Sequence, residues 1–269
     1  MTSVRDLMEP EPAPFTGTPW WEQRMVGFDL ETTAADPEEA RIVVAAVVEV
    51  GAGLPPVSRS WLVDPGIPIP AEATAVHGIT TEQAREAGYF AGDVIAELVE
   101  HLARRPEGAA LVDYNAPFDV TILDREARRY GVEPLTDRGP LLVVDPLVID
   151  KHLDRYRSGS RKLADVAARY GADLDGDGHD ADFDALLACR LAWAIATRGR
   201  VIRKGAWEQD PLQHDWDRIR PDLAALHEAQ RQWAYVQARG LARHLRQEIR
   251  TDWPLVPCSV PLIADQANK

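Results

Sequence analysis

The stretch MVGFDLETT, from Met25 to Thr33, begins as a short apolar run and ends in acidic and polar residues. This pattern is typical of a buried strand whose end is polar. Asp29 and Glu31 are two residues apart, so on a strand their side chains point to the same face. Two carboxylates that converge in an apolar setting repel each other unless a cation lies between them. We therefore expect a strand with a site at its end.

Two further strands are expected without a helix between them. RIVVAAVVEV, from Arg41 to Val50, is rich in β-branched residues and almost continuously apolar, which favours a central strand. PPVSRSWLVDP, from Pro55 to Pro65, alternates and closes with a Pro-Gly turn. Three consecutive strands of this kind predict an antiparallel meander.

The next part of the chain alternates between helical and extended patterns. Apolar spacing and Gly or Pro boundaries predict helices over 92–105, 117–130, 161–170 and 180–197, and strands over 109–112 and 141–144. The resulting order, βββ-α-β-α-β-α-α, predicts an α/β domain in which helices cover a mixed sheet of about five strands.

Two later segments add acids at positions where α/β sheets usually build their sites. Asn115-Ala-Pro-Phe-Asp119 follows the fourth strand and enters a helix, and His179-Asp-Ala-Asp-Phe-Asp184 begins a long helix. Each segment alone has an ordinary explanation, as helix-capping residues or as acids that compensate the helix dipole. The three acidic segments in this order, with elements of the right type between them, are much more specific.

FDLETT, NAPFD and HDADFD resemble the three exonuclease motifs of the DEDDh 3′–5′ exonucleases, the family of the proofreading epsilon subunit of bacterial DNA polymerase III. The segments AVHGIT, from Ala75, and VDPL, from Val144, are also similar to parts of that family, and the resemblance covers about residues 25–196. It implies a ribonuclease H-like fold, which agrees with the order of elements above. The pair Asp113-Tyr114 departs from the family, in which a small residue and His are frequent there.

The resemblance implies that Asp29, Glu31, Asp119 and Asp184 bind two divalent cations, Mg²⁺ or Mn²⁺, and that His179 is the general base. Oxygen ligands suit these hard ions. In the mechanism that the family implies, Asp29 bridges both ions, Glu31 and Asp184 complete one, and Asp119 holds the other through water. The product would be a nucleoside 5′-monophosphate from the 3′ end.

Six further residues are candidates for substrate binding, and each has a structural alternative. The two threonines can bind the terminal nucleotide or cap the strand end. His77 can line the nucleotide pocket or be a structural loop histidine. Phe118 can pack in the site, but packing in the core is the better expectation. The lysine belongs to a basic run over 151–162 that can hold phosphates or form a solvated face. The candidates are Thr32, Thr33, His77, Asn115, Phe118 and Lys162.

We expect a flexible tail over 1–22, an exonuclease domain over 23–200 and a helical extension over 201–269. In the extension, apolar residues recur at helical spacing over 221–249 and predict an amphipathic helix with a break near Gly240. Docking of this helix on the domain is the simplest expectation. The alternatives are a dimer interface or a contact with a polymerase or another protein.

Composition limits the possible classes of protein. The 269 residues include 43 acids and 30 bases, a net charge of -13, and two cysteines that cannot form a disulfide framework. There is no long apolar run and no secretory pattern at the N-terminus, so we expect a soluble cytoplasmic protein. The charge alone disfavours nucleic acid as a partner, but acids clustered around divalent ions reverse that effect locally.

Three functions remain open at this point. The first is a 3′–5′ exonuclease that degrades single-stranded DNA or frayed 3′ ends in proofreading or repair. The second is an exoribonuclease that trims RNA, as ribonuclease T and oligoribonuclease do, because no residue in the sequence reports recognition of the 2′-OH. The third is a catalytically silent nucleic-acid-binding module. Because all five motif residues are present, the third ranks last.

Overall fold

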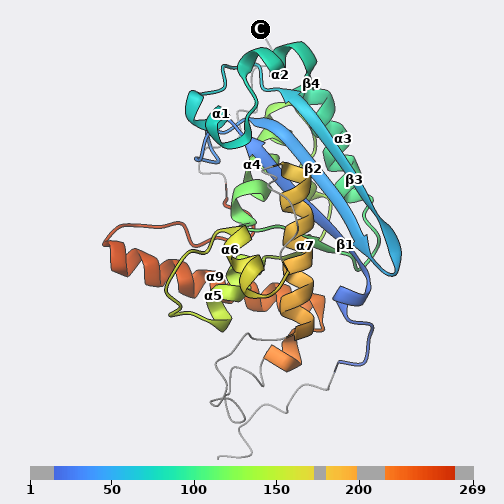
Figure 1. The fold of residues 1–269 in the computed structure, drawn as a ribbon, viewed down its shortest axis with the longest axis vertical. Helices are drawn as coiled ribbons and strands as arrows, with labels where there is room; N and C mark the ends of the chain where they lie inside the picture. The colour runs from blue at the N-terminus through green and yellow to red at the C-terminus, as the bar shows by residue number, and fades with distance from the viewer. Residues whose placement is uncertain (1–14, 173–179, 199–215, 258–269) are drawn as a thin grey trace, which may run out of the picture.

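The computed structural model describes residues 15–172, 180–198 and 216–257 of the chain. Three long strands, β1 (Arg24–Thr32), β2 (Ile42–Gly51) and β3 (Leu54–Asp64), form the expected antiparallel meander (Figure 1). Two short strands, β5 (Ala110–Val112) and β6 (Val143–Val144), then extend the sheet in parallel beside β1.

The described residues form a sheet of six strands in the order β4-β3-β2-β1-β5-β6, not of five. The additional strand, β4 (Tyr89–Phe90), pairs with the end of β3 and contains only two exposed residues. A segment this short cannot show the two-residue alternation that identifies a strand in a sequence. The α/β class and the mixed sheet are as predicted.

Five of the helices lie where the sequence predicts them, namely α3 (Ala91–Ala103), α4 (Pro117–Arg129), α6 (Leu163–Arg169), α7 (Ala181–Arg198) and α9 (Leu223–Leu245). The sequence analysis missed α1 (Ala71–His77), α2 (Thr81–Ala87), α5 (Pro146–Leu153) and two short 3-10 turns, η2 (Trp20–Glu22) and η3 (Leu135–Asp137). In α1 and α2 only Ala84 is buried among the described residues, so neither helix has an apolar stripe. Their signals are local instead, such as the capping box that Thr80 and Gln83 form at α2.

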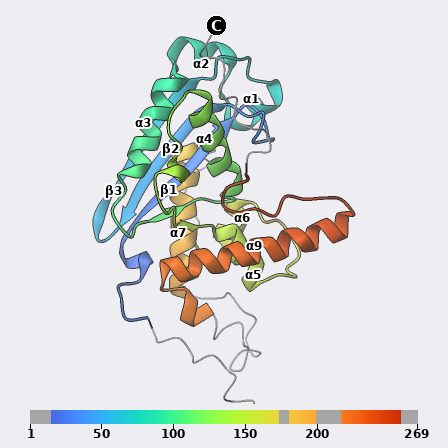
Figure 2. The ribbon, with the colours of Figure 1, turned by 180° about the vertical axis from the view of Figure 1, so that it is seen from behind.

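The helices form layers on both faces of the sheet. The long helix α7 crosses one face over β1 and β2, and α3 and α4 cover the other face (Figures 1 and 2). Side chains alternate along β1, so that Val26, Phe28 and Leu30 enter the core beneath α3 and α4. Met25 belongs to the second core cluster, which α7 lines. The residues of odd number in β1, including Asp29, therefore face α7.

Gly27 lies where β1 and α7 approach each other most closely. A Cβ atom on this residue would lie 2.5 Å from the carbonyl oxygen of Ala185 and 2.8 Å from Sγ of Cys189. Both distances are shorter than ordinary contacts, so only glycine fits without a shift of the helix. This close approach brings the start of α7 over the acidic end of β1.

The C-terminal part of the described chain docks on the domain. Helix α9 (Leu223–Leu245) lies beside β6 and α5, where Leu226 and Gln230 are fully buried. Its far end projects from the body of the molecule, as both ribbon views show. The expected break near Gly240 is absent, because α9 continues past this residue to Leu245. Among the described helices, none is both long and apolar enough to span a membrane.

Candidate active site

Two acids lie at the end of β1 on the face that α7 covers. Asp29 and Glu31 are partly buried, and they share the side of the strand with Met25 and Gly27. Asp184 lies in the first turn of α7, above this end of β1. Burial, Asp119, Asp184 and Glu31, in that order, raise the pKa of Asp29. The structure therefore brings the acids of the three sequence segments together.

Asp119 joins the site from the other face of the sheet. It lies in the first turn of α4, which begins at Pro117, and its side chain is only 3% exposed. The backbone N–H of Leu30 donates to Oδ1 of Asp119 over 3.0 Å. This bond connects the start of α4 directly to β1, between the two acids of that strand.

The acids of the site disfavour one another's ionisation. Burial, followed by the charges of Asp184 and Asp180, raises the pKa of Glu31 to about 7. Burial raises the pKa of Asp119 as well, although hydrogen bonds from Asp113 and from the backbone of Leu30 oppose the shift. Such mutual repulsion is what a bound cation would relieve. Strongly raised carboxyl pKa values in one place are also typical of functional sites.

Asp113 is a fifth acid that the sequence analysis did not include in the site. It lies directly after β5, is 1% exposed, and neither of its carboxyl oxygens accepts a hydrogen bond from a donor in the described part of the chain. Burial, followed by the charges of Asp119, Asp145 and Asp29, raises its pKa. The acid after the apolar run Ala-Ala-Leu-Val was visible in the sequence, but a single aspartate after a strand has no specific meaning.

The donor set fits hard divalent cations. Among the described residues, the donors of the site are all carboxyl oxygens, and none is a thiolate or an imidazole. Such a set of ligands favours Mg²⁺ or Mn²⁺. In the described ranges, no three potential ligand side chains already stand close enough to hold an ion. Asp29, Glu31, Asp119 and Asp184 are the residues that can hold ions here.

A surface hollow of about 240 Å³ adjoins the acids. Glu31 and His77 line it together with Ser60 of β3 and Asp180 and Asp182 near the start of α7. The backbone N–H of Ile79 donates to Nδ1 of His77 over 3.1 Å, so the other ring nitrogen carries the proton of the neutral ring. That nitrogen, Nε2, is buried, and an interaction with the backbone of Thr32 favours the charged ring. Burial lowers the pKa of His77.

The two threonines after the acids make contacts at the strand end. The Thr32 hydroxyl donates to the Ala34 carbonyl over 2.9 Å, and Oγ1 of Thr33 accepts from the Arg41 N–H over 3.0 Å. Thr33 is 4% exposed, whereas Thr32 is half-buried. These are the contacts expected if the two threonines cap the end of the strand.

The other candidates lie in different settings. Asn115 is exposed and has a left-handed backbone, with φ 74°, immediately before α4. Phe118 is partly buried and packs against the core cluster beneath α3 and α4. Lys162 is exposed at the start of α6, and among the described residues it forms no hydrogen bond or ion pair with the four acids.

Two arginines of the basic run over 151–162 have structural contacts. Arg157 and Arg161 both form ion pairs with the fully buried carboxylate of Asp150, and Arg157 does so over 2.6 Å. The Tyr170 hydroxyl contacts the same carboxylate over 3.3 Å. These two arginines therefore stabilise the packing of α5 and α6. His179, the expected general base, lies outside the described residues.

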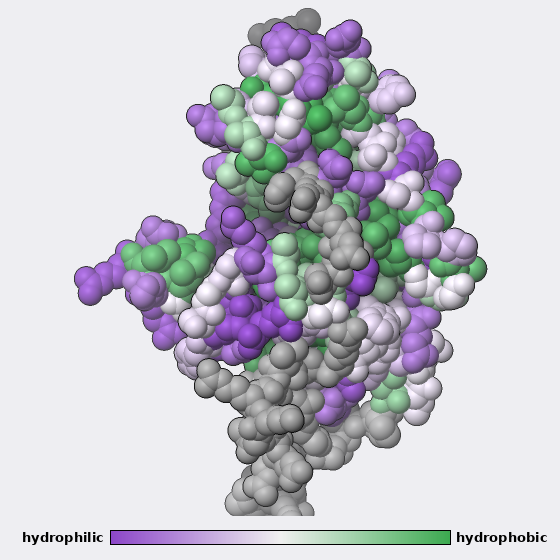
Figure 3. Space-filling view, viewed as in Figure 1, coloured by the Kyte–Doolittle hydropathy of each residue, from purple (hydrophilic) through white to green (hydrophobic). Residues whose placement is uncertain are grey.

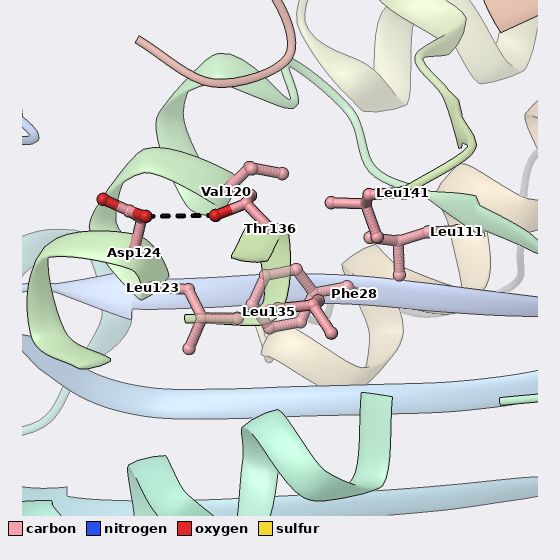
Figure 4. A pocket seen from close by; sticks show the side chains of 8 residues that line it. All are labelled: Phe28, Leu111, Val120, Leu123, Asp124, Leu135, Thr136 and Leu141. Carbon is pink, nitrogen blue, oxygen red and sulfur yellow. Dashed lines mark hydrogen bonds between the residues drawn. The ribbon is translucent and has the colours of Figure 1, made fainter. Parts of the chain in front are cut away.

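A second hollow lies inside the core and not at the acids. Figure 4 shows its lining of mostly apolar side chains, including Phe28 and Leu111, with Thr136 donating to Asp124 over 3.2 Å at one side. Its volume is about 10 Å³, so it holds one water at most. It lies on the face of β1 opposite to Asp29 and offers no reactive group to a substrate.

Comparison with protein families gives one match over most of the chain. A family model described as "Exonuclease" matches residues 26–192. An uncharacterized exonuclease of Escherichia phage 186 is 30% identical over 190 residues, which cover 67% of this chain and 92% of the phage protein. DNA polymerase III subunit epsilon of Pasteurella multocida is 27% identical over 157 residues, or 56% of this chain and 58% of that subunit.

Solved structures show the same fold. Exonuclease I from Methylocaldum szegediense superposes with a TM-score of 0.55 at 21% identity, covering 65% of this chain and 41% of that enzyme. E. coli exonuclease I in complex with a dA16 oligonucleotide superposes with a TM-score of 0.56 at 18% identity, over 66% of this chain and 41% of that one. The ribonuclease H-like fold is therefore confirmed. The chain corresponds to about two fifths of these enzymes.

Proposed function

The chain belongs to the DEDDh family of 3′–5′ exonucleases, and from this premise we propose that it hydrolyses single-stranded DNA or frayed 3′ ends to nucleoside 5′-monophosphates. The convergence of carboxyl groups from β1, α4 and α7, which raise one another's pKa, supports this proposal most strongly. Relatives named as subunits of DNA polymerase III favour a role in replication proofreading or repair.

The four motif acids are the proposed metal ligands. Two bound Mg²⁺ or Mn²⁺ ions would stabilise charge on the attacking and leaving oxygens and lower the pKa of the attacking water. Asp29, which interacts with the other three acids, would be a central ligand of the ions. Glu31, Asp119 and Asp184 would hold the ions together with it.

The remaining roles concern the substrate and the proton. His179 is proposed to take the proton from the attacking water, since its place five residues before Asp184 matches the histidine subclass of the family. His77 lines the hollow beside Glu31 and is proposed to contact the terminal nucleotide there. Thr32, Thr33, Asn115, Phe118 and Lys162 stay proposals for substrate binding, of which Thr33 and Phe118 have mainly structural contacts.

The protein partner stays a proposal too. The exposed apolar residues of α9 gather on its projecting end, as Figure 3 shows, and they include Val236, Leu241 and Leu245. We propose this end as the contact with a polymerase or another protein. We also propose that the chain is divided into a tail over 1–22, an exonuclease domain over 23–200 and an extension over 201–269, whose helix α9 docks on β6.

The test follows 5′-labelled single-stranded DNA and RNA of matched sequence on a denaturing gel, with Mg²⁺, with Mn²⁺ or with EDTA. We expect a metal-dependent ladder that shortens from the 3′ end and that Asp184→Ala abolishes. Asp93→Ala is the matched control, because Asp93 is a first-turn acid of α3 on the opposite face of the sheet. Faster loss of RNA would favour the exoribonuclease alternative. No cleavage of either polymer by the folded protein would favour the binding module.

A further inference from the structure

The carboxylate of Asp145 holds two backbone segments together at the end of β6. It is fully buried and caps α5, with Oδ1 accepting from the N–H groups of Leu147 at 2.9 Å and Val148 at 3.3 Å. The same carboxylate also accepts from the segment before α4. The N–H of Asn115 donates to Oδ1 and the N–H of Ala116 donates to Oδ2, each over 3.2 Å.

The C-terminal part of the chain holds Asp145 from the other side. The indole Nε1–H of Trp253 donates to its Oδ2 over 3.2 Å. From α9, the side chain of Gln230 accepts from the Asp145 N–H over 2.7 Å and donates to the Val143 carbonyl over 2.9 Å. Nδ1 of His227 accepts from the Val143 N–H over 3.0 Å. These side chains occupy the edge of β6 as a further strand would.

The segment that Asp145 holds also places a proposed metal ligand. Asn115 has a left-handed backbone, a conformation that persists where the surrounding structure holds it. Its carbonyl accepts from the Phe118 N–H over 2.9 Å, which starts α4. Asp119 follows in the same turn and meets β1 through the Leu30 N–H. A shift at Asn115 or Ala116 therefore moves Asp119 relative to Asp29.

We infer that the C-terminal segment is a positioning element of the metal site, acting through Gln230 and Trp253 on Asp145 and through Asp145 on the start of α4. The inference rests on the proposed function, because it assigns Asp119 to the metal site. Asp145 acts through the backbone of Asn115 and Ala116 and is therefore a positioning residue.

The test compares two Gln→Leu variants of the full chain, one of which breaks this connection while the other leaves it intact. Gln230→Leu removes both bonds to the β6 edge. Gln237→Leu is the matched control, because Gln237 also donates from α9, to the Val148 carbonyl over 2.9 Å, without contacting Asp145. Mn²⁺ affinity is measured by electron paramagnetic resonance of the free ion at a temperature where both variants are folded. Changes in outer contacts of a metal site typically weaken affinity about 10–100-fold, and we expect a loss near the lower end for Gln230→Leu and wild-type affinity for Gln237→Leu.

Two further variants test the same connection if Gln230→Leu does not fold. Trp253→Phe keeps the packing and removes one donor, and Asp145→Asn places an amide group against the donors of Ala116 and Trp253. Both should weaken Mn²⁺ binding and lower kcat more than they change KM. Wild-type Mn²⁺ affinity in the folded variants would overturn the inference and leave the proposed function standing. A wild-type protein that neither binds Mn²⁺ nor cleaves DNA would overturn both.

Discussion

At the scale of single residues, the site is a group of acids whose pKa values are raised by burial and by one another's charges, an effect that a bound cation would reverse. That Asp29, Glu31, Asp119 and Asp184 lie near one another could be predicted from the sequence, because three acidic segments follow one another in the order that the exonuclease family shows. The buried acids Asp113 and Asp145 could not be assigned a role in this way. Their importance depends on which elements surround them, and no local pattern contains that information.

The pKa of Glu31 predicts how the metal-free protein responds to pH. A carboxyl whose pKa is raised from 4.5 to about 7 on folding contributes stability below pH 4.5, and this contribution is lost as pH rises to about 7. Above pH 7 in EDTA we therefore expect Glu31→Gln to unfold at a higher temperature than the wild type, with little difference near pH 4.5. Differential scanning calorimetry across this range measures the effect.

The control for this prediction is Glu82→Gln, a change at an exposed glutamate of α2. It should show no such divergence with pH. With Mn²⁺ present, the wild type should gain more thermal stability than Glu31→Gln, since only the wild type keeps the full ligand set. A variant that is less stable than the wild type in EDTA above pH 7 would contradict the account of repelling acids.

At the scale of elements, the site depends on how closely α7 approaches β1. The sequence predicts both elements but not their separation, because Gly27 inside a strand has several explanations. The structure gives the reason: a Cβ atom there would collide with the backbone of Ala185. The same limit applies to α1, α2 and α5, which lack the long apolar stripe that marks a helix in a sequence.

Gly27→Ala tests this approach. The added methyl group must push α7 away, and overpacking of this kind typically costs about 1–3 kcal/mol of unfolding free energy. It should also weaken Mn²⁺ binding, because Asp184 moves with α7 relative to Asp29. Urea denaturation and Mn²⁺ titration measure the two effects.

Gly240→Ala is the matched control in a helix with space. A Cβ atom at Gly240 would lie 3.6 Å from an Arg155 nitrogen, an ordinary contact. Alanine is favoured over glycine in a helix interior by about 1 kcal/mol, so this variant should be more stable with unchanged Mn²⁺ affinity. Stabilisation by Gly27→Ala would contradict the close packing of α7 on β1. Destabilisation by Gly240→Ala would contradict the open space beside α9.

At the scale of the whole molecule, the order of the strands and helices and the docking of the C-terminal helix on the domain were predictable, but the place where that helix docks was not. Apolar spacing indicates that α9 must cover something, but it does not say what. In the structure α9 covers the edge of β6, where His227 and Gln230 accept hydrogen bonds from the backbone. Polar side chains that complete a sheet edge leave no period in the sequence.

The net charge of -13 predicts weak non-specific affinity for DNA, because that affinity comes mainly from Lys and Arg contacts to phosphates. The protein alone should therefore remove few nucleotides per encounter. Digestion of labelled single-stranded DNA with an excess of unlabelled trap measures this number. Long runs of cleavage per encounter would contradict the prediction, as would a steep fall of affinity with salt.

We propose that the four acids form a metal-dependent site that releases nucleotides from a 3′ end. The identity of the first product from single-stranded DNA labelled in its 3′-terminal nucleotide tests this proposal. We expect the wild type with Mg²⁺ to release labelled nucleoside 5′-monophosphate, and EDTA or Asp29→Asn to prevent its release. Labelled fragments longer than one nucleotide, or no release by the folded wild type, would contradict it.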